Sequence, residues 1–169
     1  VAGALKVLTG LGVDLINVHA VGGEKMMAAA AEAIKNKAAE LGVERPQLLA
    51  VTILTSMDEA QFAALNYNNT IAEQVVALAK LAQKAGLDGV VASPQEAAAI
   101  REACGPDFLI VTPGVRPAGS ATDDQSRIAT PAQAFSDGAT HIVVGRPIMK
   151  AKDRKAAATA IVDEIKNVG

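Results

Sequence analysis

Short apolar runs alternate with helical segments along this sequence, and that alternation constrains its fold more than any other feature. The apolar runs are continuous and do not alternate with polar residues, which is typical of strands buried on both faces of a parallel sheet. We therefore expect a single α/β domain over residues 1–169, with helices covering the sheet. A barrel of repeated βα units and a doubly wound open sheet both fit this pattern.

The pattern predicts five strands and six helices. The predicted strands are residues 13–19, 48–54, 90–92, 109–112 and 142–144. The predicted helices are residues 1–9, 23–41, 70–86, 93–105, a short helix starting at 130, and 151–168. Ser93, Thr70 and Thr130 each precede a Glu or Gln by three residues, which is the pattern of a capping box at a helix start. Residues 59–69 give no clear prediction.

Two of the predicted strands end in turns that combine glycine, arginine and proline. Residues 114–117 read Gly-Val-Arg-Pro and residues 145–147 read Gly-Arg-Pro, with a polar loop at 118–127 between them. Glycine opens the backbone, and the guanidinium group is a planar cation that suits phosphate. In barrels of parallel strands the last two such loops often hold a phosphate. The alternative is that these residues only end strands and that the arginines are solvated.

Composition excludes several classes of function. A net charge of −2 with no basic cluster in the sequence argues against nucleic acid or an anionic membrane as partner. One cysteine, Cys104, allows no internal disulfide, and with only two histidines we expect no metal site. We expect a cytoplasmic protein, with no membrane span and no signal peptide. Because the sequence starts at Val1 without a methionine, we also expect it to be the middle of a longer chain.

Six separate runs resemble one enzyme family. They are VDLINVHA (13–20), AVTILTSM (50–57), GLDGVV (86–91), VTPGVRP (111–117), DQSR (124–127) and IVVGRP (142–147). In order and spacing they resemble the bacterial orotidine 5′-phosphate decarboxylase family over essentially the whole chain. The resemblance is specific because six runs agree and several are uncommon peptides.

The resemblance implies a (β/α)8 TIM barrel of which this chain holds strands 4–8 with their helices, an incomplete barrel without the N-terminal βα units. It also implies a homodimer that converts orotidine 5′-monophosphate to UMP in pyrimidine synthesis, with no cofactor and no metal. Gly145 and Arg146 would bind the 5′-phosphate, and Arg116 would assist them. Gln125 would bridge the phosphate and the pyrimidine, while Thr55 and Ser56 would lie beside the base. Arginine forks suit phosphate, and an amide or hydroxyl can hydrogen-bond a pyrimidine edge.

The family's catalytic residues have no counterpart in this sequence. They form an array of lysine and aspartate residues on the first three strands of the barrel. We therefore expect no catalytic residue in this chain, and no decarboxylation by the chain alone. The alternative is a non-catalytic barrel fragment that binds nucleotide monophosphate or assembles with itself. Another pentose-phosphate barrel is a third possibility, which the runs at 54–57 and 124–127 oppose.

Overall fold

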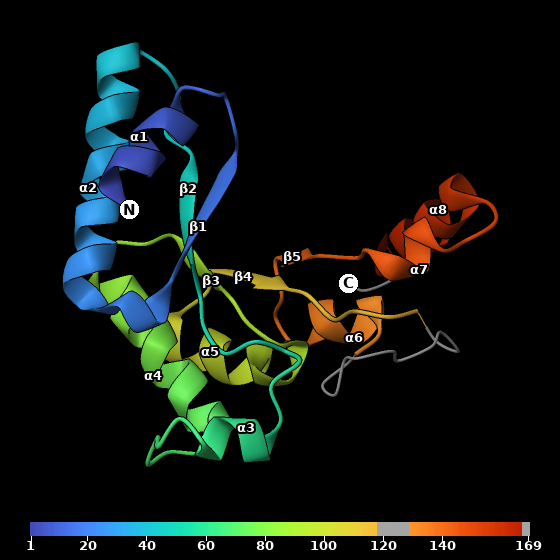
Figure 1. The fold of residues 1–169 in the computed structure, drawn as a ribbon. Helices are drawn as coiled ribbons and strands as arrows, with labels where there is room; N and C mark the ends of the chain where they lie inside the picture. The colour runs from blue at the N-terminus through green and yellow to red at the C-terminus, as the bar shows by residue number, and fades with distance from the viewer. Residues whose placement is uncertain (118–128, 167–169) are drawn as a thin grey trace.

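The computed structural model describes residues 1–117 and 129–166 and places them around a five-stranded parallel sheet (Figure 1). The strands are β1 (Leu15–His19), β2 (Gln47–Val51), β3 (Gly89–Val91), β4 (Leu109–Thr112) and β5 (His141–Ile142). Each strand pairs in parallel with the one that follows it along the chain, in the order β1-β2-β3-β4-β5. The predicted parallel sheet is thus confirmed.

The sequential strand order distinguishes the two topologies that the sequence left open. A doubly wound sheet reverses its strand order at a switch point, and this sheet has no such reversal. It winds in one direction, as a barrel does, and β1 and β5 form its two edges. Among the described residues nothing joins these edges, so the described fold is a partial barrel.

Most predicted helices are confirmed, and two predictions of helix boundaries are wrong. The α-helices are α1 (Ala2–Thr9), α2 (Gly23–Leu41), α3 (Glu59–Ala63), α4 (Ile71–Lys84), α5 (Ala97–Cys104), α6 (Pro131–Ser136), α7 (Arg146–Met149) and α8 (Arg154–Lys166), with 3-10 turns η1 (Ala20–Gly22) and η2 (Pro94–Glu96). The predicted helix at 93–105 begins as the 3-10 turn η2. The predicted helix at 151–168 is α8, and its first residues belong to the linker after α7.

The three predicted capping boxes form to different extents. Thr70 and Glu73 make both reciprocal bonds at the start of α4. Thr130 caps α6 by accepting from the backbone of Gln133, whose side chain instead donates to Asp137. The hydroxyl of Ser93 accepts from the backbone of Gln95, two residues on, because the chain there makes the tighter 3-10 turn.

Three strands are shorter than predicted, and the first of them, predicted at 13–19, is β1 at Leu15–His19. The strand predicted at 48–54 is β2 and ends at Val51; the N–H of Thr52 makes the last ladder bond, to the carbonyl of Val91, and the chain then turns at Leu54. The strand predicted at 142–144 is the two-residue β5, which has a strand partner on one side only. Apolar composition therefore overestimated the length of all three strands.

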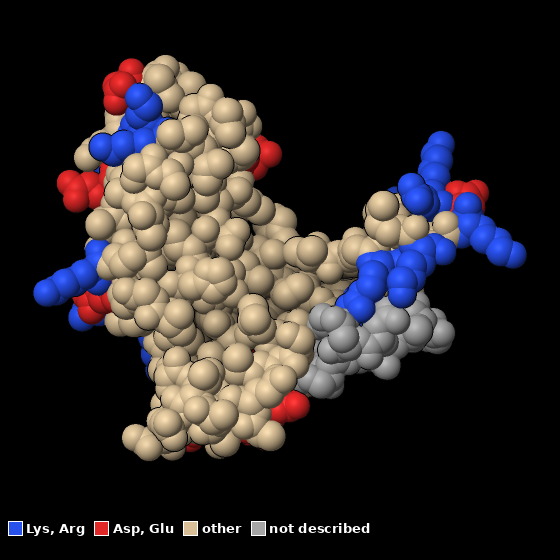
Figure 2. All heavy atoms as spheres, in the orientation of Figure 1, with Lys and Arg blue, Asp and Glu red and all other residues tan. Residues whose placement is uncertain are grey.

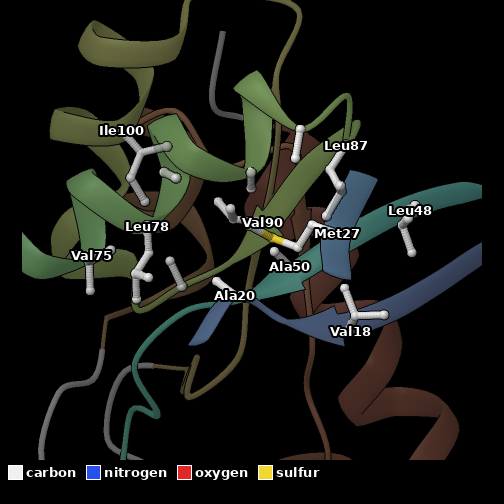
Figure 3. Close-up of a cluster of buried hydrophobic side chains, with 14 of the residues drawn as sticks. Val18, Ala20, Met27, Leu48, Ala50, Val75, Leu78, Leu87, Val90 and Ile100 are labelled. Atoms are coloured by element: carbon white, nitrogen blue, oxygen red, sulfur yellow. The ribbon is translucent and has the colours of Figure 1, made fainter. Parts of the chain in front are cut away.

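The main hydrophobic core lies between the sheet and α2, α4 and α5 (Figure 3). Met27 and Ile34 of α2 are fully buried, as are Val75 of α4 and Ile100 of α5. Figure 3 shows Met27 reaching over the sheet beside Ala50 and Val90. Full burial of each large apolar side chain contributes about 1.5–3 kcal/mol to stability, so this core is the main source of the fold's stability.

A second, smaller core lies beside β5, the last strand of the sheet. It contains three buried residues, Val115, Ala134 and Ala139, against which Ile142 and Val144 pack. We call residues 1–112 the body, and residues 113–117 and 129–166 the C-terminal lobe. Figures 1 and 2 show the lobe, with α6, α7 and α8, projecting from the body across a narrow waist.

The sheet's second face is open at β1. Along this strand Ile16 and Val18 are buried in the main core, whereas the alternate residues Leu15, Asn17 and His19 are exposed. Alternate residues of a strand point to opposite faces of a sheet. The exposed set therefore faces the side that would be the interior of a closed barrel.

Candidate functional site

The predicted site residues follow three different strands. Thr55 and Ser56 come after β2, Arg116 after β4, and Gly145 and Arg146 after β5. Because all five strands are parallel, the segments that follow them all leave the sheet at the carboxyl ends of the strands. The fold therefore brings these turns to the same end of the sheet, where ligands bind in parallel α/β proteins.

Thr55 and Ser56 are the two central residues of a tight turn. The N–H of Met57 donates to the carbonyl of Leu54 at 3.0 Å, which closes the turn around them. Thr55 is buried, and Ser56 is exposed. Asp58 then starts α3 with a capping box to Gln61, which fixes the direction of the chain after the turn. The hydroxyl of Ser56 is thus held on a rigid turn and is available to a ligand.

Arg116 is a buried cation next to the second core. Its side chain is almost fully buried, its backbone N–H donates to Ala129 at 2.9 Å, and one terminal nitrogen donates to the carbonyl of Val115 at 2.9 Å. Its Nε has no hydrogen-bond partner within the part of the chain that the structure describes. A buried guanidinium with an unused N–H donor favours the binding of an anion.

Gly145 and Arg146 form the start of α7. The carbonyl of Gly145 accepts from Ile148 and Met149, while Arg146 is the first residue of the helix and is partly buried. A side chain built on Gly145 would meet no atom within 4 Å. Packing therefore does not require glycine here, and the space in front of this backbone is open to a ligand.

Gln125 lies outside the described residues. Each of the remaining predicted residues follows the carboxyl end of a strand. A cleft of about 720 Å³ lies at the opposite end of the strands and includes Asp14, Arg45, Gln47 and His141. The candidate site is therefore a set of turns at the carboxyl ends of the strands, away from this cleft.

Positive charge is concentrated on the C-terminal lobe. Figure 2 shows lysine and arginine side chains gathered over α7 and α8, and the residues are Arg146, Lys150, Lys152, Arg154, Lys155 and Lys166. The expectation that the chain has no basic cluster is wrong locally, because these residues come together although the whole chain carries a net charge of −2. A phosphate at Gly145 would lie in this positive field.

The described residues contain no cluster of three or more metal-ligating side chains, and none of their helices combines the length and apolarity needed to cross a membrane. Cys104 is buried, and burial raises the pKa of its thiol, so the group is neutral at pH 7 and is a poor nucleophile.

Sequence reasoning missed a contact that joins the body to the lobe. Arg101, in the last turn of α5, donates to the carbonyl of Gly138 in the lobe at 2.8 Å. Its other terminal nitrogen donates to the carbonyls of Gly105, Pro106 and Phe108 in the body. An arginine near a helix C-terminus that precedes Gly and Pro is a signal for carbonyl capping, but the distant partner Gly138 leaves no local trace in the sequence.

Comparison with known proteins places the chain in a family. Residues 1–161 match the sequence model of the family described as orotidine 5′-phosphate decarboxylase / HUMPS. The chain belongs to this family. It is 56% identical to the orotidine 5′-phosphate decarboxylases of Moorella thermoacetica, over 99% of this chain and 67% of that protein, and of Trichlorobacter lovleyi, over 98% and 68%. The chain thus spans about two thirds of the length of these relatives.

Solved structures agree with the family assignment. The orotidine 5′-phosphate decarboxylase of Lactobacillus acidophilus superposes with a TM-score of 0.83 at 41% identity, covering 97% of this chain and 68% of that one. The enzyme from Pyrococcus horikoshii, at 22% identity and a TM-score of 0.68, is similar in fold. The expected family and the expected barrel fold are both confirmed, while the roles of individual residues stay predictions.

Proposed function

We propose that this chain is the phosphate- and pyrimidine-binding part of an orotidine 5′-phosphate decarboxylase, which converts orotidine 5′-monophosphate to UMP and CO2. The observation that carries the proposal is that the turns at Thr55, Arg116 and Gly145 all lie at the carboxyl ends of the parallel strands. Membership of the family supplies the chemical class of the substrate.

In the proposed complex the body and the C-terminal lobe bind opposite ends of one nucleotide. Arg116, Arg146 and the N–H of Gly145 bind the 5′-phosphate, with Gln125 bridging toward the base. Thr55 and Ser56 hydrogen-bond the pyrimidine edge. The positive lobe attracts the anionic nucleotide, and burial of Arg116 strengthens its attraction for phosphate.

Binding at both ends contributes to catalysis by orientation. Loss of CO2 leaves negative charge on the pyrimidine carbon, which a neighbouring ammonium group can stabilise and then protonate. The family's lysine and aspartate array would do this, and we propose that it belongs to polypeptide that this sequence does not include. Phosphate and base contacts hold the reacting end against that array.

The proposal is tested by titrating the 169-residue chain with UMP in a calorimeter. We expect binding without turnover of orotidine 5′-monophosphate. Arg146→Gln removes charge-assisted hydrogen bonds to phosphate, each contributing about 1.5–3 kcal/mol, and should weaken binding of UMP at least tenfold. Arg154→Gln, the same change on the exposed start of α8, should alter binding much less. Absence of UMP binding, or equal effects of the two variants, would contradict the proposal.

A self-assembling barrel fragment is the second candidate, and the open sheet edges favour it. Both edge strands carry exposed apolar neighbours, namely Val13 and Leu15 at β1 and Val143 after β5. Unprotected strand edges promote pairing with another chain. Sedimentation of the chain with and without UMP separates the two candidates, because assembly without nucleotide binding fits only the second.

The homodimer and the cytoplasmic location are parts of the first proposal. Family resemblance is the reason to expect the dimer, and the single buried cysteine is compatible with a reducing compartment.

A further inference from the structure

We propose that Arg101 is a positioning residue that sets the separation between the phosphate-binding turns of the lobe and the pyrimidine-binding turn of the body. This inference rests on the proposed function. It concerns a residue that contacts neither end of the nucleotide in the proposed complex and acts through the contact between body and lobe.

The two ends of the proposed site belong to different parts of the molecule. Thr55 and Ser56 lie in the body, next to the main core. Arg116 and Gly145 lie in the lobe, beside the small core of Val115, Ala134 and Ala139. A nucleotide that spans both ends therefore senses how the lobe is placed on the body, whereas a ligand that occupies one end does not.

Among the described residues, one short strand pair and its flanking hydrogen bonds attach the lobe to the sheet. The strand pair β4–β5 is short, with Val111 opposite His141 and Thr112 opposite Ile142. At its start, Thr140 exchanges backbone and hydroxyl hydrogen bonds with Ile110, at 2.9–3.0 Å. These bonds hold one edge of the lobe, and a second point of attachment is needed to prevent rotation about the strand.

Arg101 provides that second point. One terminal nitrogen donates to three carbonyls of the α5–β4 loop, at 2.6 Å to Gly105, 2.8 Å to Pro106 and 2.8 Å to Phe108. The other donates to Gly138, 2.8 Å away, in the segment that leads from α6 to β5. One planar cation thus joins the body to the lobe, and its fixed geometry transmits the position of α5 to β5.

Gly138 is adapted to this contact. Its φ of +101° is a conformation that other residues rarely adopt, and a Cβ there would lie 3.2 Å from the Cβ of Arg101. Glycine therefore lets the lobe's backbone approach the arginine side chain closely. Two residues later comes Thr140, so the arginine contact and the strand pair act on the same short segment.

Arg101→Lys separates the two tasks of the guanidinium. A single ammonium can still donate to the three loop carbonyls, which lie around one nitrogen, but it lacks the second nitrogen that reaches Gly138. We expect the body to keep its stability and the lobe to lose its fixed placement. Affinity that comes from joining two weak contacts depends on their geometry, so UMP should bind about tenfold more weakly.

The test compares three ligands on the full 169-residue chain by ligand-observed NMR titration: UMP, uridine and ribose 5-phosphate. Arg101→Lys should weaken UMP about tenfold and leave uridine and ribose 5-phosphate within about twofold, because each of these occupies one side only. Gly138→Ala, which disturbs the same contact from the lobe, should also weaken UMP while leaving the two smaller ligands unchanged. Arg45→Lys is the control. It breaks the bidentate contact with Asp88 inside the body and should lower stability without this difference between the ligands.

The possible results of this test distinguish the positioning role from a structural role and from failure of the proposed function. Unchanged binding of UMP by both Arg101→Lys and Gly138→Ala overturns the positioning role. Equal weakening of all three ligands also overturns it, because that result describes a structural residue. If the unaltered chain binds none of the three, the proposed function fails and the positioning role fails with it. If the unaltered chain binds the three ligands but the variants do not weaken UMP selectively, only the positioning role fails.

Discussion

The body and the C-terminal lobe bury hydrophobic side chains on very different scales. The core of the body combines residues of the sheet and of the helices that cover it, including Met27 of α2, Val90 of β3 and Ile100 of α5. In the lobe, three buried residues form the core among the described residues. Hydrophobic burial is the dominant stabilising contribution in folding. We infer that the body stabilises itself, whereas the lobe depends on its attachment to the body.

The difference separates stability from function in this chain. The proposed phosphate contacts lie in the lobe, where Arg116 is buried beside a small core and Arg146 starts a four-residue helix. Segments with few buried apolar contacts open most readily. The weakly stabilised part of the molecule therefore carries the residues that we propose to bind the phosphate.

The largest expected effect is in the core of the body. Ile100→Ala removes a fully buried side chain from α5 and should destabilise the chain by about 2–5 kcal/mol, measured by urea unfolding followed by circular dichroism. Val162→Ala, on an exposed face of α8, is the control and should change stability by less than about 0.5 kcal/mol. A small loss for Ile100→Ala would mean that the body does not depend on this core.

A smaller and more local effect is expected in the lobe. Val115→Ala leaves a cavity beside Ala134 and should speed amide hydrogen exchange in α6 and α8, measured by mass spectrometry. Exchange in α2 and α4 should stay as in the unaltered chain. Faster exchange in all four helices would contradict the division into a self-sufficient body and a dependent lobe.

The smallest effect concerns a helix cap in the body. Glu73 accepts hydrogen bonds from the backbone and hydroxyl of Thr70, and these bonds hold the pKa of its carboxyl below the usual value. A carboxyl whose pKa is lower in the folded state stabilises above its unfolded pKa, and this stabilisation is lost as pH falls through the folded pKa. Glu73→Gln should therefore lower the melting temperature slightly at pH 7 and not at low pH. A difference that persists at low pH would show that the charge is not responsible.

The sequence was a better guide to the body than to the lobe, for a physical reason. Long periodic segments such as α2 and α4, with glycine or a capping box at their ends, carry their structure in local residues, and α2 was predicted to the residue. The order of the strands was not available from periodicity, because any parallel sheet gives the same pattern of apolar runs. Pairing between neighbours is a tertiary property, and it required the structure.

In the lobe the predictions failed where tertiary contacts override local pattern. The apolar run at 142–144 has the composition of a strand, but with one neighbouring strand the pairing stops at Ile142. Arg116 and Arg146 were predicted as site residues because arginine beside glycine and proline is a local pattern. Arg101 was missed because its partner Gly138 lies 37 residues further along the chain.

The most direct test of the account is hydrogen exchange of the 169-residue chain with and without saturating UMP. If one nucleotide spans both regions, protection should increase together at the turn of Thr55 and Ser56 in the body and at the turns of Arg116 and Arg146 in the lobe. Arg146→Gln should reduce protection at both places at the same UMP concentration. Protection confined to one region, or none at either, would contradict a shared nucleotide site at the carboxyl ends of these strands.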